Sequence, residues 1–413
     1  MLRIILVTLF ALFLAGCSRT PTTLDARTQV KALPKYAFAN APVVDVLGLG
    51  PTKTSHIYSE GRYHHLPCGY LTAHHEAPPR VHQLLLGQIV RVISQKPYET
   101  LVEVPSALIG SGKKTIPITG WVLNRYLTST DILDKRKNRD VAFADPHNLI
   151  GRKKTPRIAL TRPYTISEAN LTLSAGTLLP LVAEQKSVFL THIWDAHEKQ
   201  FRQLLVPKNV ALIQTELSRP EAMRRFIGLL RYWAGQKEGF IPYVLGGGSW
   251  THNYTNKRFS RKGSGKTLEY HREGAIDHIH SGFDCTTLLY NAAQIVGIPY
   301  TCRNTTAISQ KLDRLKPGET LEAGDLILYP GHVAIITTLK PLRLIQARGY
   351  GPGYGRLVEG LAEHHLGGIK TISDLQRHLK EKRPLQVLRV NKKLYALQKS
   401  WGIYRFRSCW QQK

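Results

Sequence analysis

The most informative part of the chain is the stretch FDCTTLLY at residues 283–290. It places Cys285 between a polar loop residue and an apolar run that can form a helix. A thiol at a helix N-terminus lies where the helix dipole and free backbone N–H groups favour the thiolate over the thiol. We therefore predict that Cys285 begins a helix and is a candidate nucleophile.

A histidine follows downstream in GDLILYPGHV at residues 324–333. A Gly-Asp turn there precedes an apolar strand, and His332 begins the next apolar run. An imidazole beside a thiol can take its proton and later return it to a leaving amine. The order of cysteine on a helix and histidine on a strand favours a catalytic role for Cys285. The alternative is a core cysteine, because free cysteines are among the most buried residue types.

The chain as a whole is basic. Its 413 residues include 57 Lys+Arg and 29 Asp+Glu, which gives a formal net charge of +28. This charge attracts anionic partners, whether nucleic acid, anionic lipid or acidic cell-wall peptide. The sequence has no aromatic-interleaved basic motif and no basic recognition helix, so we predict no nucleic-acid partner.

The N-terminus has the pattern of an export signal. A basic start is followed by an apolar run at residues 4–15 that is too short for a stable membrane-spanning helix. The signal, predicted at residues 1–16, ends in LAGC at 14–17, which resembles the bacterial lipobox. The resemblance implies lipid attachment at Cys17. In a cell that has an outer membrane, Ser18 implies an anchor in that membrane facing the periplasm. The alternative is an ordinary signal peptide with an incidental cysteine.

The chain upstream of Cys285 predicts β-rich domains. After a lipidated linker at residues 17–60, short strands and turns fill residues 61–135, with GWV at 120–122. This segment resembles a bacterial SH3-type barrel, a module associated with cell walls. A fainter second copy is predicted at residues 150–215.

A change of pattern near Ser218 indicates the start of a third domain at residues 218–413. Ser218 can cap a helix that carries Pro220 and Glu221 in its first turn. Apolar residues then recur on one helical face. We predict a second helix from Cys285 to about Val296. The strands predicted after it are 325–329, 332–337 and 343–347, with a basic helix after about 370 and a closing strand at 404–407.

Four motifs in chain order resemble the NlpC/P60 cell-wall peptidases. They are PYVLGG at 242–247, FDC at 283–285, GDL at 324–326 and GHVAI at 331–335. The resemblance implies an α+β protein whose papain-like catalytic domain follows one or two all-β SH3-like barrels. It implies hydrolysis of peptidoglycan stem peptides, at the γ-D-Glu–diamino acid bond, through a thioester. We expect no cofactor, no metal and a monomer.

The resemblance also assigns roles to individual residues. Cys285 would be the nucleophile and His332 the base and then the general acid. Gln346 would accept the imidazole N–H and fix its tautomer, although it could instead merely cover a strand end. Tyr243 would stabilise the oxyanion or hold substrate. Asp284 would meet the free amine of an L-Ala-γ-D-Glu stem peptide.

The sequence departs from the family pattern directly after the cysteine. The family usually has Ser-Gly there, and this chain has Thr286 and Thr287. Thr286 preserves a hydroxyl, but Thr287 adds bulk and β-branching in the first helical turn. A second hypothesis follows from this departure, namely a catalytically inactive lipoprotein that binds the cell wall.

The chain has five cysteines in all. With Cys17 and Cys285 assigned, Cys68, Cys302 and Cys409 remain. In an exported protein they allow at most one disulfide and one free thiol.

Three further patterns predict no function. The stretch GSGKT at 263–267 resembles the end of a phosphate-binding loop but lacks that motif's first glycine, so we interpret it as a basic loop. The groups HHLPC at 64–68 and HHE at 74–76 lack the spacing of zinc ligands, and we predict no metal site from them.

Overall fold

The computed structural model describes most of the chain after residue 32. The described residues are 33–48, 80–135, 138, 141–145, 147–151, 155–215, 217–253, 259–262, 269–272, 281–349, 352 and 354–411. Several predictions lie outside them: the signal at 1–16, Cys17, Cys68, the histidine groups at 64–68 and 74–76, and the loop at 263–267. No helix among the described residues is long and apolar enough to cross a membrane.

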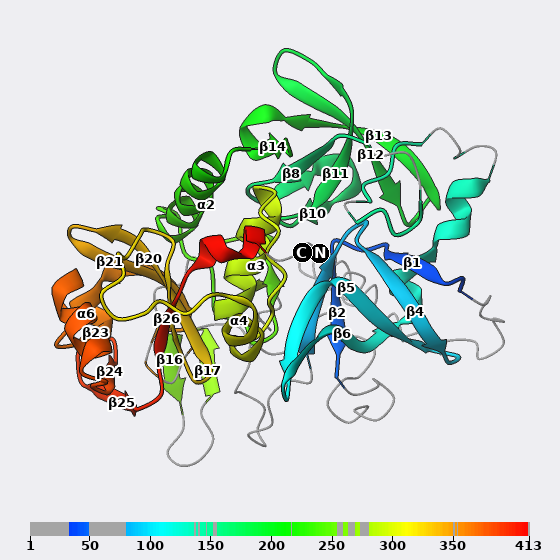
Figure 1. Cartoon of the computed structure of the whole chain (residues 1–413). Helices are drawn as coiled ribbons and strands as arrows, with labels where there is room; N and C mark the ends of the chain where they lie inside the picture. Colours follow the sequence, from blue (N-terminus) through cyan, green and yellow to red (C-terminus); the bar gives the residue numbers. More distant parts are fainter. Residues whose placement is uncertain are drawn as a thin grey trace, which may run out of the picture. The chain divides into compact units, whose positions relative to one another are not determined.

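The first β-rich region is a seven-stranded antiparallel sheet with the order β3-β2-β6-β5-β4-β1-β7 (Figure 1). Its elements are β1 (Tyr36–Ala39), β2 (Val43–Leu47), β3 (Arg80–Leu85), β4 (Ile89–Gln95), β5 (Glu99–Ser111), β6 (Lys114–Leu123), η3 (Asn124–Tyr126), β7 (Leu127–Ser129) and η4 (Thr130–Asp134). The predicted linker at 17–60 therefore extends too far, because β1 and β2 lie within it. Both strands are short and almost fully buried, so they lack the alternation that identifies a half-exposed strand.

The second β-rich region covers the fainter predicted copy at 150–215. Its main sheet has the order β13-β12-β11-β8-β14, and β9 and β10 form a separate pair. The elements are β8 (Arg157–Leu160), β9 (Tyr164–Ile166), η6 (Ser167–Ala169), β10 (Leu171–Leu173), β11 (Leu178–Glu184), β12 (Val188–Asp195), β13 (Gln200–Pro207), η7 (Lys208–Val210) and β14 (Ala211–Ile213). In neither region do the outermost described strands pair to close a barrel, so the SH3-like character of both stays a prediction.

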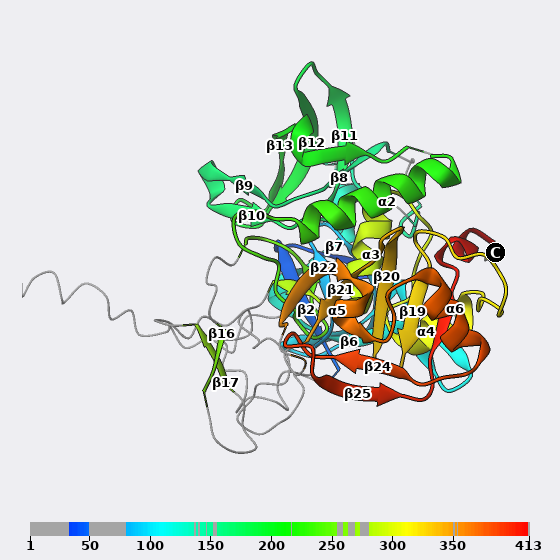
Figure 2. The same cartoon turned by 90° about the vertical axis from the view of Figure 1, so that its left-hand side faces the viewer.

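The C-terminal region mixes helices with a five-stranded antiparallel sheet of order β22-β21-β20-β19-β26 (Figure 2). Its helices are α2 (Arg219–Ala234), α3 (Cys285–Ile295), α4 (Thr305–Lys311), α5 (Ala362–His365), α6 (Ile372–Lys380) and η8 (Phe406–Gln411). Its strands are β15 (Gly248–Ser249), β16 (Phe259–Lys262), β17 (Glu269–Arg272), β18 (Gly282–Phe283), β19 (Leu326–Tyr329), β20 (His332–Leu339), β21 (Leu342–Arg348), β22 (Arg356–Leu361), β23 (Leu366–Gly367), β24 (Leu385–Leu388), β25 (Leu394–Gln398) and β26 (Gly402–Tyr404).

These elements confirm the helices predicted after Ser218, at Cys285 and after residue 370, as well as the three strands predicted between 325 and 347. The closing strand is shifted from the predicted 404–407 to β26. The shift arises because η8, a 3₁₀ helix, begins at Phe406 and ends the extended backbone.

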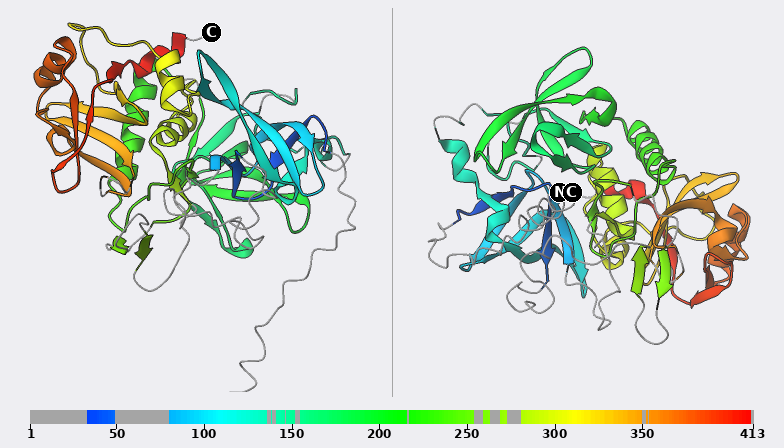
Figure 3. Two further views of the ribbon diagram at one scale, coloured as in Figure 1. Left: turned by 90° about the horizontal axis from the view of Figure 1, so that it is seen from below. Right: turned by 180° about the vertical axis from the view of Figure 1, so that it is seen from behind.

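The five-stranded sheet is buried on both faces. Leu326 and Leu328 of β19 pack in the same apolar core as α2 and α3, whereas Ile327 and Tyr329 pack in the core that contains α6. Successive side chains of a strand point to opposite faces, so a continuous apolar strand such as β19 is what a sheet covered on both sides requires. Figure 3 shows these layers from two further directions.

The first β-rich region contacts the segment that precedes α3. The Gln83 side chain of β3 accepts hydrogen bonds from Gly248 N at 2.8 Å and Ser249 Oγ at 2.9 Å. On α3, the Tyr290 hydroxyl lies 2.9 Å from Ser106 Oγ of β5. Strands β3 and β5 of the first β-rich region, which are distant from α3 in the sequence, therefore form part of its surroundings.

Candidate active site

Helix α3 begins with a complete capping box. The Asp284 carboxylate accepts from Thr286 N at 2.8 Å and from Thr287 N at 2.7 Å, while Thr287 Oγ1 accepts from Asp284 N at 2.8 Å. These bonds satisfy backbone N–H groups that a helix start otherwise leaves unpaired. Thr287, the departure from the family pattern, thus helps to hold Cys285 at the first helical position.

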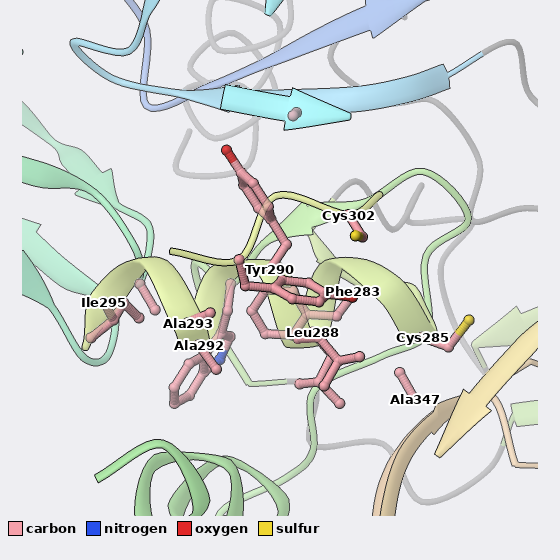
Figure 4. Packing of buried hydrophobic residues seen from close by; sticks show 14 of the residues in the cluster. Phe283, Cys285, Leu288, Tyr290, Ala292, Ala293, Ile295, Cys302 and Ala347 are labelled. Atoms are coloured by element: carbon pink, nitrogen blue, oxygen red, sulfur yellow. The ribbon is translucent and has the colours of Figure 1, made fainter. Parts of the chain in front are cut away.

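The sulfur of Cys285 lies against the start of β20. Its thiol donates to the Gly331 carbonyl at 4.0 Å, and the Val333 N–H forms a hydrogen bond with the sulfur. These two residues flank His332 in the chain. In Figure 4, Cys285 occupies the N-terminal end of α3 with Ala347 of β21 beside it.

A tight turn positions His332. Tyr329 of β19 pairs with His332 of β20, so the connection is the two residues Pro330 and Gly331. Gly331 has a φ of 76°, which an L side chain rarely adopts, and proline with glycine in this order is typical of a type II turn. The turn places the imidazole at the start of β20, the central strand of the sheet, with the Tyr329 ring 5.2 Å from it between centroids.

Gln346 is the hydrogen-bond partner of that imidazole. His332 Nε2 lies 2.9 Å from Gln346 Oε1, on the neighbouring strand β21. When Nε2–H donates to this oxygen, Nδ1 is left unprotonated and able to accept a proton. The sequence-predicted partnership of His332 with Gln346 is thus present in the structure.

Burial sets the charge of both groups. It raises the pKa of the Cys285 thiol to about 12, and the Asp284 carboxylate acts in the same direction. It lowers the pKa of His332 to about 4, assisted by the Arg348 guanidinium and opposed by the hydrogen bond with Gln346. At neutral pH the resting groups are therefore a thiol and a neutral imidazole. The thiolate that we expected from the helix N-terminus is outweighed by desolvation.

Asp284 is occupied as a helix cap. Besides the bonds within the cap, its Oδ2 accepts from Gly246 N at 3.2 Å. The guanidinium of Arg303 lies 3.6 Å from Oδ1. The predicted contact with a substrate amine would have to share a carboxylate whose oxygens already have partners.

Tyr243 lies beside the segment that leads into α3. Its backbone forms a parallel bridge with Phe283, and its N–H donates to Gly355 O at 2.9 Å. The ring is buried next to Gly349, where an added Cβ would meet it at 3.5 Å. Tyr243 is therefore near both β18, the strand that leads into α3, and the end of β21.

Two buried arginines near the site were missed by the sequence analysis. Arg303 donates to Thr286 Oγ1 at 3.1 Å and to His82 Nδ1 of β3 at 3.1 Å. Arg348 stacks over Tyr354 at 4.4 Å and donates to Leu388 O at 2.9 Å. Arg348 follows Gln346 by two residues on a strand, so alternation alone could have placed both on one face. No local pattern marks Arg303.

Two further cysteines are described, and neither forms a disulfide. Cys302 and Cys409 are free and buried in the same core as α3. The part of the chain that the structure describes contains no group of three or more His, Cys, Asp or Glu residues arranged to hold a metal ion.

Comparisons with known proteins give a likeness of fold. No protein-family profile matches the chain, and no curated protein matches its sequence. An NlpC/P60 family protein from Bacillus cereus ATCC 10987 is similar in structure, with 17% sequence identity, a TM-score of 0.50, and coverage of 79% of this chain and 93% of that one. This likeness shows an NlpC/P60-type fold.

Two further solved structures align less well. NlpC2 from Trichomonas vaginalis has 10% identity and a TM-score of 0.29, over 90% of this chain and 98% of that one. The peptidoglycan hydrolase RipB from Mycobacterium tuberculosis has 23% identity and a TM-score of 0.22, over 35% of this chain and 61% of that one. These two TM-scores are too low to support a shared arrangement.

Proposed function

We propose that this chain is a cysteine peptidase that hydrolyses stem-peptide amide bonds of peptidoglycan, at the γ-D-Glu–diamino acid bond. The observation that carries the proposal is the contact of Cys285 Sγ with Gly331 and Val333, on both sides of His332. The His332–Gln346 hydrogen bond, the four NlpC/P60-like motifs and the fold support it.

The reaction proceeds in two halves. As Cys285 Sγ attacks the carbonyl carbon, its proton passes to His332 Nδ1, and the carbonyl oxygen becomes an oxyanion. Collapse breaks the C–N bond, the imidazolium gives its proton to the leaving amine, and a thioester remains. His332 then takes a proton from water, the hydroxide attacks the thioester, and the thiol leaves reprotonated. Gln346 holds the imidazole in the tautomer that both halves need.

The remaining parts of the chain deliver this chemistry to its substrate. We propose that the two β-rich regions are SH3-like modules that bind the wall. Lipidation at Cys17 would hold the protein at the outer membrane, facing the periplasm. The net charge of +28 favours the approach to acidic stem peptides.

Mass spectrometry of defined muropeptides tests the proposal. We expect the wild-type chain to split tri- and tetrapeptide stems, and Cys285→Ala to leave them intact. Cys302→Ala is the matched control, because it removes another buried thiol and should retain activity. Intact stems with the wild type, or equal cleavage by Cys285→Ala, would contradict the peptidase. Wall binding without cleavage would instead support the inactive lipoprotein.

A further inference from the structure

A basic cavity lies on the face of the five-stranded sheet opposite Cys285. Its volume is about 670 Å³, and its walls come from loop 314–317, the end of α6, and loop 399–401. Leu315, Leu379 and Trp401 form its apolar floor and belong to the core that contains α6. Cys285 belongs to the other core, so the basic cavity is separate from the candidate active site.

The lining of the basic cavity carries positive charge. Arg314, Lys316, Lys382 and Lys399 all line it and are exposed, and none of its described lining residues is acidic. Two carboxylates close by in the sequence have other partners. Glu319 pairs with Arg405 at 3.1 Å, and Glu381 pairs with Arg383. The cavity therefore presents a concentrated positive field with no internal counter-ion among the described residues.

The loops that carry these cations are tied to the core. Arg314 Nη2 donates to Trp401 O at 3.0 Å, and Leu315 N donates to Ile403 O at 2.8 Å. The indole of Trp401 donates to Arg383 O at 2.8 Å. An anion would thus meet a site that is largely formed in advance, which lowers the entropy lost on binding.

Lys382 occupies a position where glycine is normally preferred. Helix α6 ends in a Schellman motif, in which Arg383 N donates to His378 O at 2.9 Å and Lys382 N donates to Leu379 O at 3.4 Å. Lys382 is the left-handed residue of this motif, with a φ of 53°. A side chain in that conformation costs roughly 1 kcal/mol relative to glycine. The chain therefore carries a lysine beside the cavity at the expense of backbone stability.

We propose that the basic cavity binds a compound with at least two phosphate groups. Lysine ammonium groups act as point charges and suit tetrahedral phosphate oxygens, whereas planar carboxylates are best matched by a free arginine fork. The one arginine of the lining, Arg314, already uses one terminal nitrogen on Trp401 O. Soluble oligophosphates and the neighbouring phosphate headgroups of a lipid surface share this chemistry. The proposal is independent of the peptidase reaction.

Calorimetry with inorganic tripolyphosphate tests the proposal on the full chain. The cavity variant combines Lys316→Gln, Lys382→Gly and Lys399→Gln. The control variant combines Lys186→Gln, Lys392→Gly and Lys393→Gln, so it loses the same charge outside the cavity. Lys392 also has a left-handed backbone, with a φ of 62°, which matches the glycine substitution.

At about 0.15 M salt we expect the wild type and the control variant to bind alike, and the cavity variant to bind at least roughly tenfold more weakly. Equal weakening in both variants, no binding by the wild type, or equally tight binding of citrate would overturn the proposal. Sedimentation with phosphatidic acid vesicles, against phosphatidylcholine vesicles, identifies the source. If the wild type sediments with phosphatidic acid vesicles and the cavity variant does not, the ligand is a lipid headgroup. If the wild type binds tripolyphosphate but not these vesicles, the ligand is a soluble phosphate.

Discussion

In the proposed mechanism, His332 acts as a base only while its imidazole is neutral. Burial lowers its pKa to about 4, so the competent form persists well below the ordinary histidine pKa of ~6.5. We therefore expect kcat/KM to stay level from neutral pH downward and to fall as the pH passes through about 4. A pH–rate profile with a defined stem peptide measures this. An acid limb near the ordinary value would show that the imidazole is more solvated than the structure indicates.

Arg348 supplies part of that shift. Its guanidinium lowers the pKa of His332 as the second cause after burial. In Arg348→Gln we expect the acid limb of the kcat/KM profile to move to higher pH, while Arg348→Lys, which retains a positive charge, leaves it nearer its original position. If Arg348 had a purely structural role, both variants would have a lower kcat/KM and the acid limb would stay at the same pH. Circular dichroism checks that each variant is folded.

In the proposed mechanism, Gln346 orients the imidazole and does not itself transfer a proton. His332→Ala should lower kcat by roughly 10²–10⁴-fold, the range of a general acid–base group. Gln346→Ala should lower kcat by a smaller factor, because the imidazole remains and only its tautomer and orientation are no longer fixed. Steady-state kinetics of both variants measure the difference. Equal losses would mean that Gln346 does more than orient His332.

At the scale of residues, the hydrogen bond between His332 and Gln346 could be predicted because chemistry and local sequence pattern coincide there. His332 and Gln346 are recognisable because each stands at a motif on a predicted strand, and the structure joins them at 2.9 Å. Arg303 was not recognisable, because its contacts with Asp284 and His82 depend on how a loop after α3 returns to the helix start. Nothing in the sequence near Arg303 indicates that return.

At the scale of elements, the start of α3 depends on Thr287. Its hydroxyl accepts from Asp284 N, and the side chain is fully buried. We expect Thr287→Gly to lower the free energy of unfolding by roughly 1–2 kcal/mol, through the lost cap and the lower helix propensity of glycine. Thr287→Ser keeps the hydroxyl and should cost less. Urea titrations measure both values, and a neutral Thr287→Gly would contradict the capping role.

Helices and strands were predictable where their apolar residues recur with a regular period or where a residue signals the start or end of the element. Helix α3 begins at an Asp cap and its chain turns at Gly297, which has a φ of 76°. Strands β1 and β2 were not predictable. They are runs of four and five residues that are almost entirely buried, so they do not show the alternation of apolar and polar residues that identifies a strand. Their partners lie far away in sequence, as in the pairing of Leu47 with Trp121.

At the scale of the whole molecule, the described regions share one core. A single apolar cluster includes Val46 of the first β-rich region, Ala159 of the second, and Leu288 of α3. Buried polar contacts such as that of Gln83 with Gly248 N join the regions further. These long-range contacts could not be read from the sequence, because its patterns describe neighbours along the chain and not surfaces that meet after folding.

A shared core predicts cooperative unfolding. We expect tryptophan fluorescence and far-ultraviolet circular dichroism to report one coincident urea transition, because the β-rich regions and the α3 region lose their packing together. Two resolved transitions would show that the regions fold independently and that their common core contributes little.

The most direct test of the catalytic role of Cys285 is to trap the acyl-enzyme. The wild-type chain is mixed with a stem peptide, quenched in acid within one turnover, and digested for peptide mass mapping. The mechanism predicts a stem-peptide adduct, joined as a thioester, on the fragment that contains Cys285 and on no other cysteine. Hydrolysis of the stem peptide with the adduct on another residue would contradict it.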